Sequence, residues 1–212
     1  MKRVLLLLIV ASLCLTAAAQ VQPVSVTTSV AKTYRQFDDE IKDGTYSNHY
    51  FGLNYKLPTG YVAQDQETRD RILEAGREAM KRDKEAAAAG PERGFFMLMI
   101  ATPEDKMVPQ ISLMAQDVLL VPQIKSGAEF VNATGDALVQ QGFTKVKGPE
   151  SVKIGGKEFF RSDFTHTNGA KQAIMATIVR RHAIAYILTA LSNEDLETAV
   201  ASVRATAFTE TK

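Results

Sequence analysis

The stretch of sequence that decides the fold is SVKIGGKEFFRSDFTHTNGAKQAIMATIVRRHAIAYILTA, residues Ser151–Ala190. Short runs rich in β-branched and aromatic residues alternate there with turn signals, a pattern that predicts consecutive strands. The predicted strands are 151–154, 157–165, 171–181 and 183–190. Gly155-Gly156 and Asn168-Gly169 favour tight hairpin turns between them. Because a hairpin joins antiparallel neighbours, the stretch predicts a mainly antiparallel sheet.

Capping signals predict one helix before this stretch and one after it. The two capping boxes are Ser126 with Glu129 and Ser192 with Asp195. The first helix is expected to end at Gly142, a natural C-terminal cap, and the second at about Val203. Helices packed on a mainly antiparallel sheet define the fold class as α+β.

Three further strands and a charged helix are predicted in the first half of the chain. The strands are Tyr50–Leu57, Phe95–Ala101 and Gln110–Val118, and the helix is Gln66–Ala89. The helix has a thin apolar stripe, so it either lies on the sheet, as such stripes usually do, or forms an exposed arm that grips a partner. Met97 and Met99 are expected on one face of their strand, where methionine is ordinary core filler rather than a metal ligand.

Residues 1–19 have the pattern of a cleavable signal peptide. A basic start precedes the apolar run Val4–Leu15, which is too short to span a bilayer, although a membrane anchor is the alternative interpretation. Small residues then lead to a predicted cleavage after Ala19. Residues 20–45 are polar without periodicity and are expected to form an arm or linker. These features predict a periplasmic or secreted protein with no transmembrane span after cleavage.

The remaining residues, 46–212, suffice for a single domain. The chain has 25 Lys and Arg against 24 Asp and Glu, a balance that argues against nucleic-acid binding. Its one cysteine, Cys14, lies in the predicted signal peptide, so the mature chain has no thiol nucleophile and no disulfide. The three histidines do not have the spacing of a metal site, and no cofactor is predicted.

Four segments of the chain are YFGLNYKLPTGY (50–61), VKIGGKEF (152–159), AYILTA (185–190) and SVRATAF (202–208). Together these segments resemble PsbP-like domains. The first ends a strand in a Pro–x–Gly–aromatic turn, and the resemblance runs over about residues 46–208. It implies an α/β/α sandwich around a mainly antiparallel sheet. Relatives include a photosystem II extrinsic subunit and a nuclear-import factor that binds a small GTPase, so it also implies protein binding and assembly rather than catalysis.

The candidate binding residues are Arg180, Arg181 and His182, a short basic patch at a strand end. Such a patch either holds an anionic ligand or an acidic partner surface, or is simply solvated, as short charge runs usually are. His166 is the one histidine with an acid nearby on its strand, but alternation places Asp163 on the opposite face. A His–Asp couple is therefore not expected, and no catalytic residue is predicted.

Two functional hypotheses follow. The first is an exported, soluble, non-catalytic module of the bacterial envelope that binds or assembles with another envelope protein. The second is a small-ligand carrier or hydrolase whose pocket is built from residues distant in sequence. The sequence shows neither a phosphate-binding loop nor a Gly-x-Ser-x-Gly elbow, so it favours the first hypothesis and leans against an enzyme.

Overall fold

A computed structural model provides the structure of the chain and describes residues 37, 39–81 and 94–209. The predicted signal peptide, most of the predicted arm and the last part of the predicted charged helix lie outside these residues.

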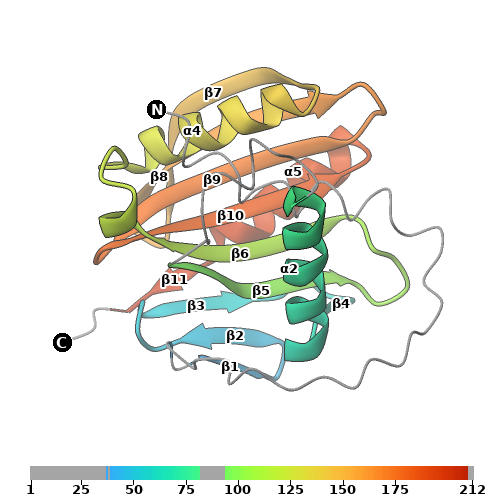
Figure 1. Cartoon of the computed structure of the whole chain (residues 1–212). Helices are drawn as coiled ribbons and strands as arrows, with labels where there is room; N and C mark the ends of the chain where they lie inside the picture. The colour runs from blue at the N-terminus through green and yellow to red at the C-terminus, as the bar shows by residue number, and fades with distance from the viewer. Residues whose placement is uncertain (1–36, 38, 82–93, 210–212) are drawn as a thin grey trace.

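The centre of the fold is a seven-stranded sheet with the order β4-β5-β6-β10-β9-β8-β7 (Figure 1). Its strands are β4 (Tyr61–Ala63), β5 (Phe95–Pro103), β6 (Gln110–Asp117), β7 (Phe143–Ile154), β8 (Lys157–His166), β9 (Lys171–Val179) and β10 (His182–Ala190). All strand pairs in the described residues are antiparallel, which confirms the predicted sheet. β7 begins eight residues before the predicted strand, and two register shifts near Gly148-Pro149 accommodate the turn residues within this edge strand.

A second sheet with the order β1-β2-β3-β11 was not predicted. Its strands are β1 (Asp39–Lys42), β2 (Thr45–Asn48), β3 (Leu53–Lys56) and β11 (Ala207–Phe208). The predicted strand Tyr50–Leu57 contributes only β3, because the Asn48 side chain accepts a hydrogen bond from the Phe51 N–H at 3.1 Å within the turn that joins β2 to β3. β1 and the buried Phe37 lie within residues 20–45, the range assigned to the arm or linker.

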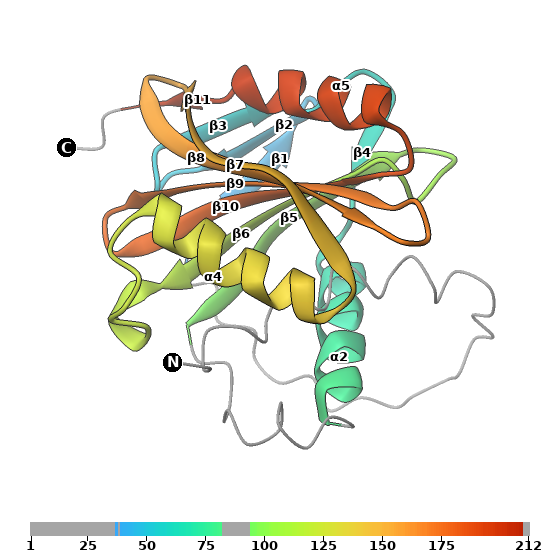
Figure 2. The same ribbon diagram turned by 90° about the horizontal axis from the view of Figure 1, so that it is seen from above.

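The helices lie on both faces of the seven-stranded sheet (Figure 2). They are α2 (Gln66–Lys81), α4 (Gly127–Gln140) and α5 (Asn193–Arg204), with a short 3-10 helix η2 (Val118–Leu120). Figure 2 shows α5 and the second sheet on one face and α4 and α2 on the other, so the predicted α/β/α sandwich is confirmed, with a sheet added to one outer layer. Both serines cap their helices: the hydroxyl oxygens of Ser126 and Ser192 accept backbone N–H groups at 3.2 and 3.0 Å.

Two hydrophobic clusters fill the spaces on either side of the central sheet. The expectation that Met97 and Met99 lie on one face of their strand is wrong. Met99 belongs to the cluster facing the second sheet, whereas Met97 packs against the cluster under α4. A register shift between these two residues turns the side chains to opposite faces. In the part of the chain that the structure describes, no helix is both long and apolar enough to cross a membrane.

Candidate functional site

Two of the three predicted binding residues form the turn between β9 and β10, at the left of Figure 1. Arg180 and Arg181 are exposed there. Arg180 has a φ of 54°, a left-handed conformation that side chains other than glycine rarely adopt. Its guanidinium carbon lies 4.7 Å from the centroid of the Tyr50 ring, a cation–π contact between the turn and the second sheet's β2–β3 connection. The contact orients the Arg180 side chain toward the second sheet.

Arg181 is held to the end of β6. Its Nη2 atom lies 3.0 Å from Oδ2 of Asp117, and its carbonyl oxygen accepts the Val118 N–H at 2.9 Å. Asp117 also caps η2, because its other carboxylate oxygen accepts the Leu119 N–H at 3.0 Å. One aspartate therefore links the arginine turn to η2.

The 3-10 helix presents two leucines beside this turn. Leu119 is 64% exposed and Leu120 is 52% exposed. A Cβ on Gly94 would lie 2.7 Å from the Leu120 side chain, so only glycine lets the start of β5 pass this closely beneath η2. We call the set Arg180, Arg181, Leu119 and Leu120 the arginine–leucine surface.

The third predicted residue, His182, is not part of that surface. His182 is 1% exposed and lies between the two sheets. As part of a short basic patch, its side chain was expected to be exposed. The reason for its burial is strand alternation: His182 is the first residue of β10 and points to the same face as Ile184 and Tyr186, which the second sheet covers.

Four aromatic rings surround the His182 imidazole, and we call them the aromatic cluster. Their centroid distances to the imidazole are 5.5 Å for Phe37, 5.7 Å for Tyr50, 5.3 Å for Phe51 and 6.4 Å for Phe96. Phe37 also contacts the other three rings at 4.9 to 5.1 Å. The cluster thus joins the segment before β1, the β2–β3 turn and the central sheet directly behind the arginine–leucine surface.

The His182 imidazole is buried without polar partners. Neither ring nitrogen has a hydrogen-bond partner among the described residues. Burial lowers the pKa of His182 below its ordinary value of 6.5, an effect that Asp117 opposes and Arg181 reinforces. A neutral imidazole is therefore the form that the fold accommodates.

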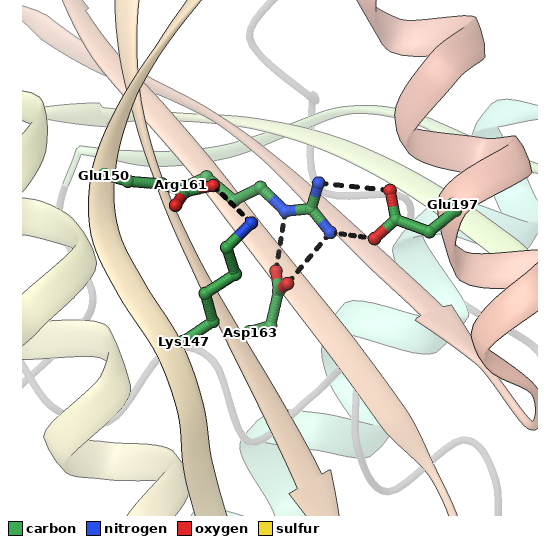
Figure 3. A network of polar contacts seen from close by, with 5 residues as sticks. All are labelled: Lys147, Glu150, Arg161, Asp163 and Glu197. Atoms are coloured by element: carbon green, nitrogen blue, oxygen red, sulfur yellow. Dashed lines mark hydrogen bonds and ion pairs between the residues drawn. The ribbon is translucent and has the colours of Figure 1, made fainter.

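A cluster of charged side chains lies between β8 and α5 (Figure 3). Arg161, only 2% exposed, donates from Nε and Nη2 to the two oxygens of Asp163 at 2.7 and 2.9 Å. It also donates from Nη1 and Nη2 to the carboxylate of Glu197 on α5. An exposed ion pair lies nearby, in which Nζ of Lys147 is 2.7 Å from Oε1 of Glu150. Since Arg161 holds both carboxylates, the cluster fastens α5 to the sheet.

This cluster predicts an acid dependence of stability. The hydrogen bond from Arg161 lowers the pKa of the Glu197 carboxyl below its ordinary value of 4.5. Such a group stabilises the fold above pH 4.5, and the contribution is lost as the pH falls through the lowered pKa. Glu197→Gln is expected to reduce the free energy of unfolding at pH 7 by at most about 1 kcal/mol, because the carboxylate is solvent-screened. Urea unfolding from pH 7 to pH 3 checks this, and a difference that persists at pH 3 would contradict it.

His166 and Asp163 contact different partners. Asp163 faces Arg161, whereas the His166 ring packs on Phe143 at 4.8 Å and its Nδ1 accepts the Asn168 N–H. A shallow hollow of about 350 Å³ lies beside the start of α4. Its lining residues are Lys125, Ser126, Gly127, Lys157, Glu158, Phe160, Thr177 and Ile178. Among the described residues, no three His, Cys, Asp or Glu side chains gather as a metal ion would require.

No family model and no curated protein matches the chain. The solution structure of cyanobacterial PsbP (CyanoP) from Synechocystis sp. PCC 6803 is similar, with 12% identity, a TM-score of 0.47, and coverage of 78% of this chain and 91% of that one. The crystal structure of LpqN, involved in cell envelope biogenesis of Mycobacterium tuberculosis, has 13% identity, a TM-score of 0.43, and coverage of 74% and 83%. A PsbP structure is thus among those that the chain resembles, as the sequence predicted. Identities and TM-scores this low bear on nothing beyond that likeness.

Proposed function

We propose that this chain is a non-catalytic protein-binding module of the bacterial envelope, and that it holds another envelope protein against the arginine–leucine surface. The observation that carries the proposal is the exposure of Leu119 and Leu120 on η2, which Asp117 links to the turn that exposes Arg180 and Arg181. Exposed apolar side chains rimmed by polar groups mark interaction sites, and arginine is enriched at interfaces.

The surface is also held in position before any partner arrives. Asp117 fixes Arg181 and caps η2, and the Tyr50 ring supports Arg180. Ordering these side chains therefore costs little on binding, which leaves more of the contact energy for affinity. Tyr50 belongs to the aromatic cluster, whose rings pack closely against one another.

Charge complementarity indicates the chemistry of the partner. Two guanidinium groups beside two leucines fit a surface that carries carboxylates next to an apolar patch. Export through the signal peptide at residues 1–19 would bring the chain to the periplasm or the outside of the cell, where another envelope protein supplies that surface.

The test compares two double variants as baits in the host's envelope fraction. Arg180→Glu with Leu119→Asp reverses the charge and apolarity of the surface, while Lys153→Glu with Val139→Asp makes the same changes at exposed positions on β7 and α4. We expect the wild type and the Lys153→Glu/Val139→Asp control to capture the same protein. Capture of that protein by the Arg180→Glu/Leu119→Asp variant should fall at least tenfold, because replacing a residue central to an interface costs more than about 1 kcal/mol of binding free energy. Equal capture by both pairs, at equal urea midpoints, would refute the proposal.

A further inference from the structure

We infer that His182 makes the arginine–leucine surface acid-sensitive: a proton taken up by the buried imidazole opens the aromatic cluster and withdraws the Tyr50 ring on which Arg180 lies. The effect on binding rests on the proposed function, whereas the opening of the cluster is a property of the fold alone.

The imidazole cannot carry a charge where it lies. It is 1% exposed, and its two nitrogens have no partner among the described residues. An imidazolium has two N–H donors and a full charge, and burying such a group without an acceptor is strongly unfavourable. Protonation therefore requires water to reach the ring.

Of the charged groups around the ring, Asp117 favours the imidazolium and Arg181 disfavours it. Arg181 follows Arg180 in the same turn, and both are cations. Asp117, the acid at the end of β6, is already bound to Arg181 at 3.0 Å. The β2–β3 connection contributes the exposed His49 next to Tyr50.

The architecture determines which part of the cluster gives way. His182 belongs to ladders of eight and nine residue pairs with β6 and β9, and Phe96 belongs to the six-pair ladder between β5 and β6. Both residues lie on interior strands of the central sheet. Phe37 and Tyr50 come from the segment before β1 and from a turn of the second sheet, whose strands are two to four residues long. Opening by movement of Phe37 and Tyr50 therefore breaks fewer backbone hydrogen bonds than movement of the strands that carry His182 and Phe96. Because Arg180 lies over Tyr50, that movement breaks the cation–π contact.

The sign of the pH dependence follows from linkage. Burial lowers the pKa of His182 in the closed state below 6.5, so the open state binds the proton more readily. The closed state is therefore fully stable above about pH 6.5 and loses stability as the pH falls toward the lowered pKa. Over that window the equilibrium constant for opening or unfolding rises by up to about tenfold per pH unit.

Proton NMR of the folded wild type between pH 7.5 and 5 tests the opening directly. We expect His182 to titrate below 6.5, and contacts between its ring and Tyr50 to weaken as it does. Contacts between Tyr55 and Tyr186, which also join the two sheets at 5.7 Å, should remain. Persistence of the His182–Tyr50 contacts after His182 is protonated, or titration at or above 6.5, would overturn the inference.

A variant pair provides an independent readout. His182→Phe suits the aromatic surroundings and removes the titrating group, while His49→Gln removes an exposed histidine as a matched control. From pH 6.5 to 5.5, the unfolding constant of the wild type and of His49→Gln should rise up to about tenfold more than that of His182→Phe. Parallel pH profiles of the wild type and His182→Phe would overturn the inference. Failure to find any partner would leave these results unchanged and would count against the proposed function alone.

Discussion

Replacing Arg161 with alanine is expected to lower the free energy of unfolding by about 3–5 kcal/mol, because it leaves Asp163 as a buried charge without its partner. Arg161 is 2% exposed, and its guanidinium donates to both oxygens of Asp163 and to Glu197. The loss includes the packing of the long side chain between β8 and α5. Urea unfolding at pH 7 measures the difference.

Two further variants separate the buried charge from the lost packing. Arg161→Met with Asp163→Leu removes both charges and keeps apolar volume, so it should recover much of the stability that Arg161→Ala loses. Lys147→Ala, which removes an exposed cation from the neighbouring strand, should change the free energy by no more than about 0.5 kcal/mol. If Arg161→Ala destabilises no more than Lys147→Ala, the cluster does not fasten α5 to the sheet.

Gly127→Ala is expected to destabilise the protein by about 1–3 kcal/mol or more, although alanine is the better helix former. A Cβ at this position would lie 2.2 Å from the carbonyl oxygen of Ala176 and 2.8 Å from its carbonyl carbon. Both atoms belong to the backbone of β9, so no side-chain rotation relieves the clash, and α4 must move away from the sheet. Thermal or urea unfolding measures the loss.

An exposed position on the same helix provides the control. Asp136→Ala gains helix propensity without a clash and should be neutral or stabilising by a few tenths of a kcal/mol. A Gly127→Ala variant as stable as Asp136→Ala would show that α4 does not approach β9 as closely as the structure has it.

Local signals explain why the central sheet could be predicted. Gly155-Gly156 and Asn168-Gly169 fix the hairpins by their own conformational preferences, and the capping boxes mark helix starts within four residues. The second sheet depends instead on pairing across the whole chain. β11 is two residues long and pairs with Leu53 and Asn54, about 150 residues earlier, so no local pattern identifies it.

The candidate site was predictable in part for the same reason. Arg180 and Arg181 could be placed at a turn because the flanking strands are clear in the sequence. The burial of His182 depends on Phe37 and Tyr50, more than 130 residues away, and on the face that the second sheet covers. The opposite orientations of Met97 and Met99 depend on a bulge that alternation alone does not reveal.

In the proposed function, the arginine–leucine surface holds another protein. Native mass spectrometry of the mature chain, captured gently from its host's envelope fraction, detects such a complex. We expect a complex heavier by the mass of one protein, and we expect it to be lost when Arg180→Glu is combined with Leu119→Asp. A bare chain, or one carrying only a few hundred daltons as a pocket-bound small molecule would add, would contradict it.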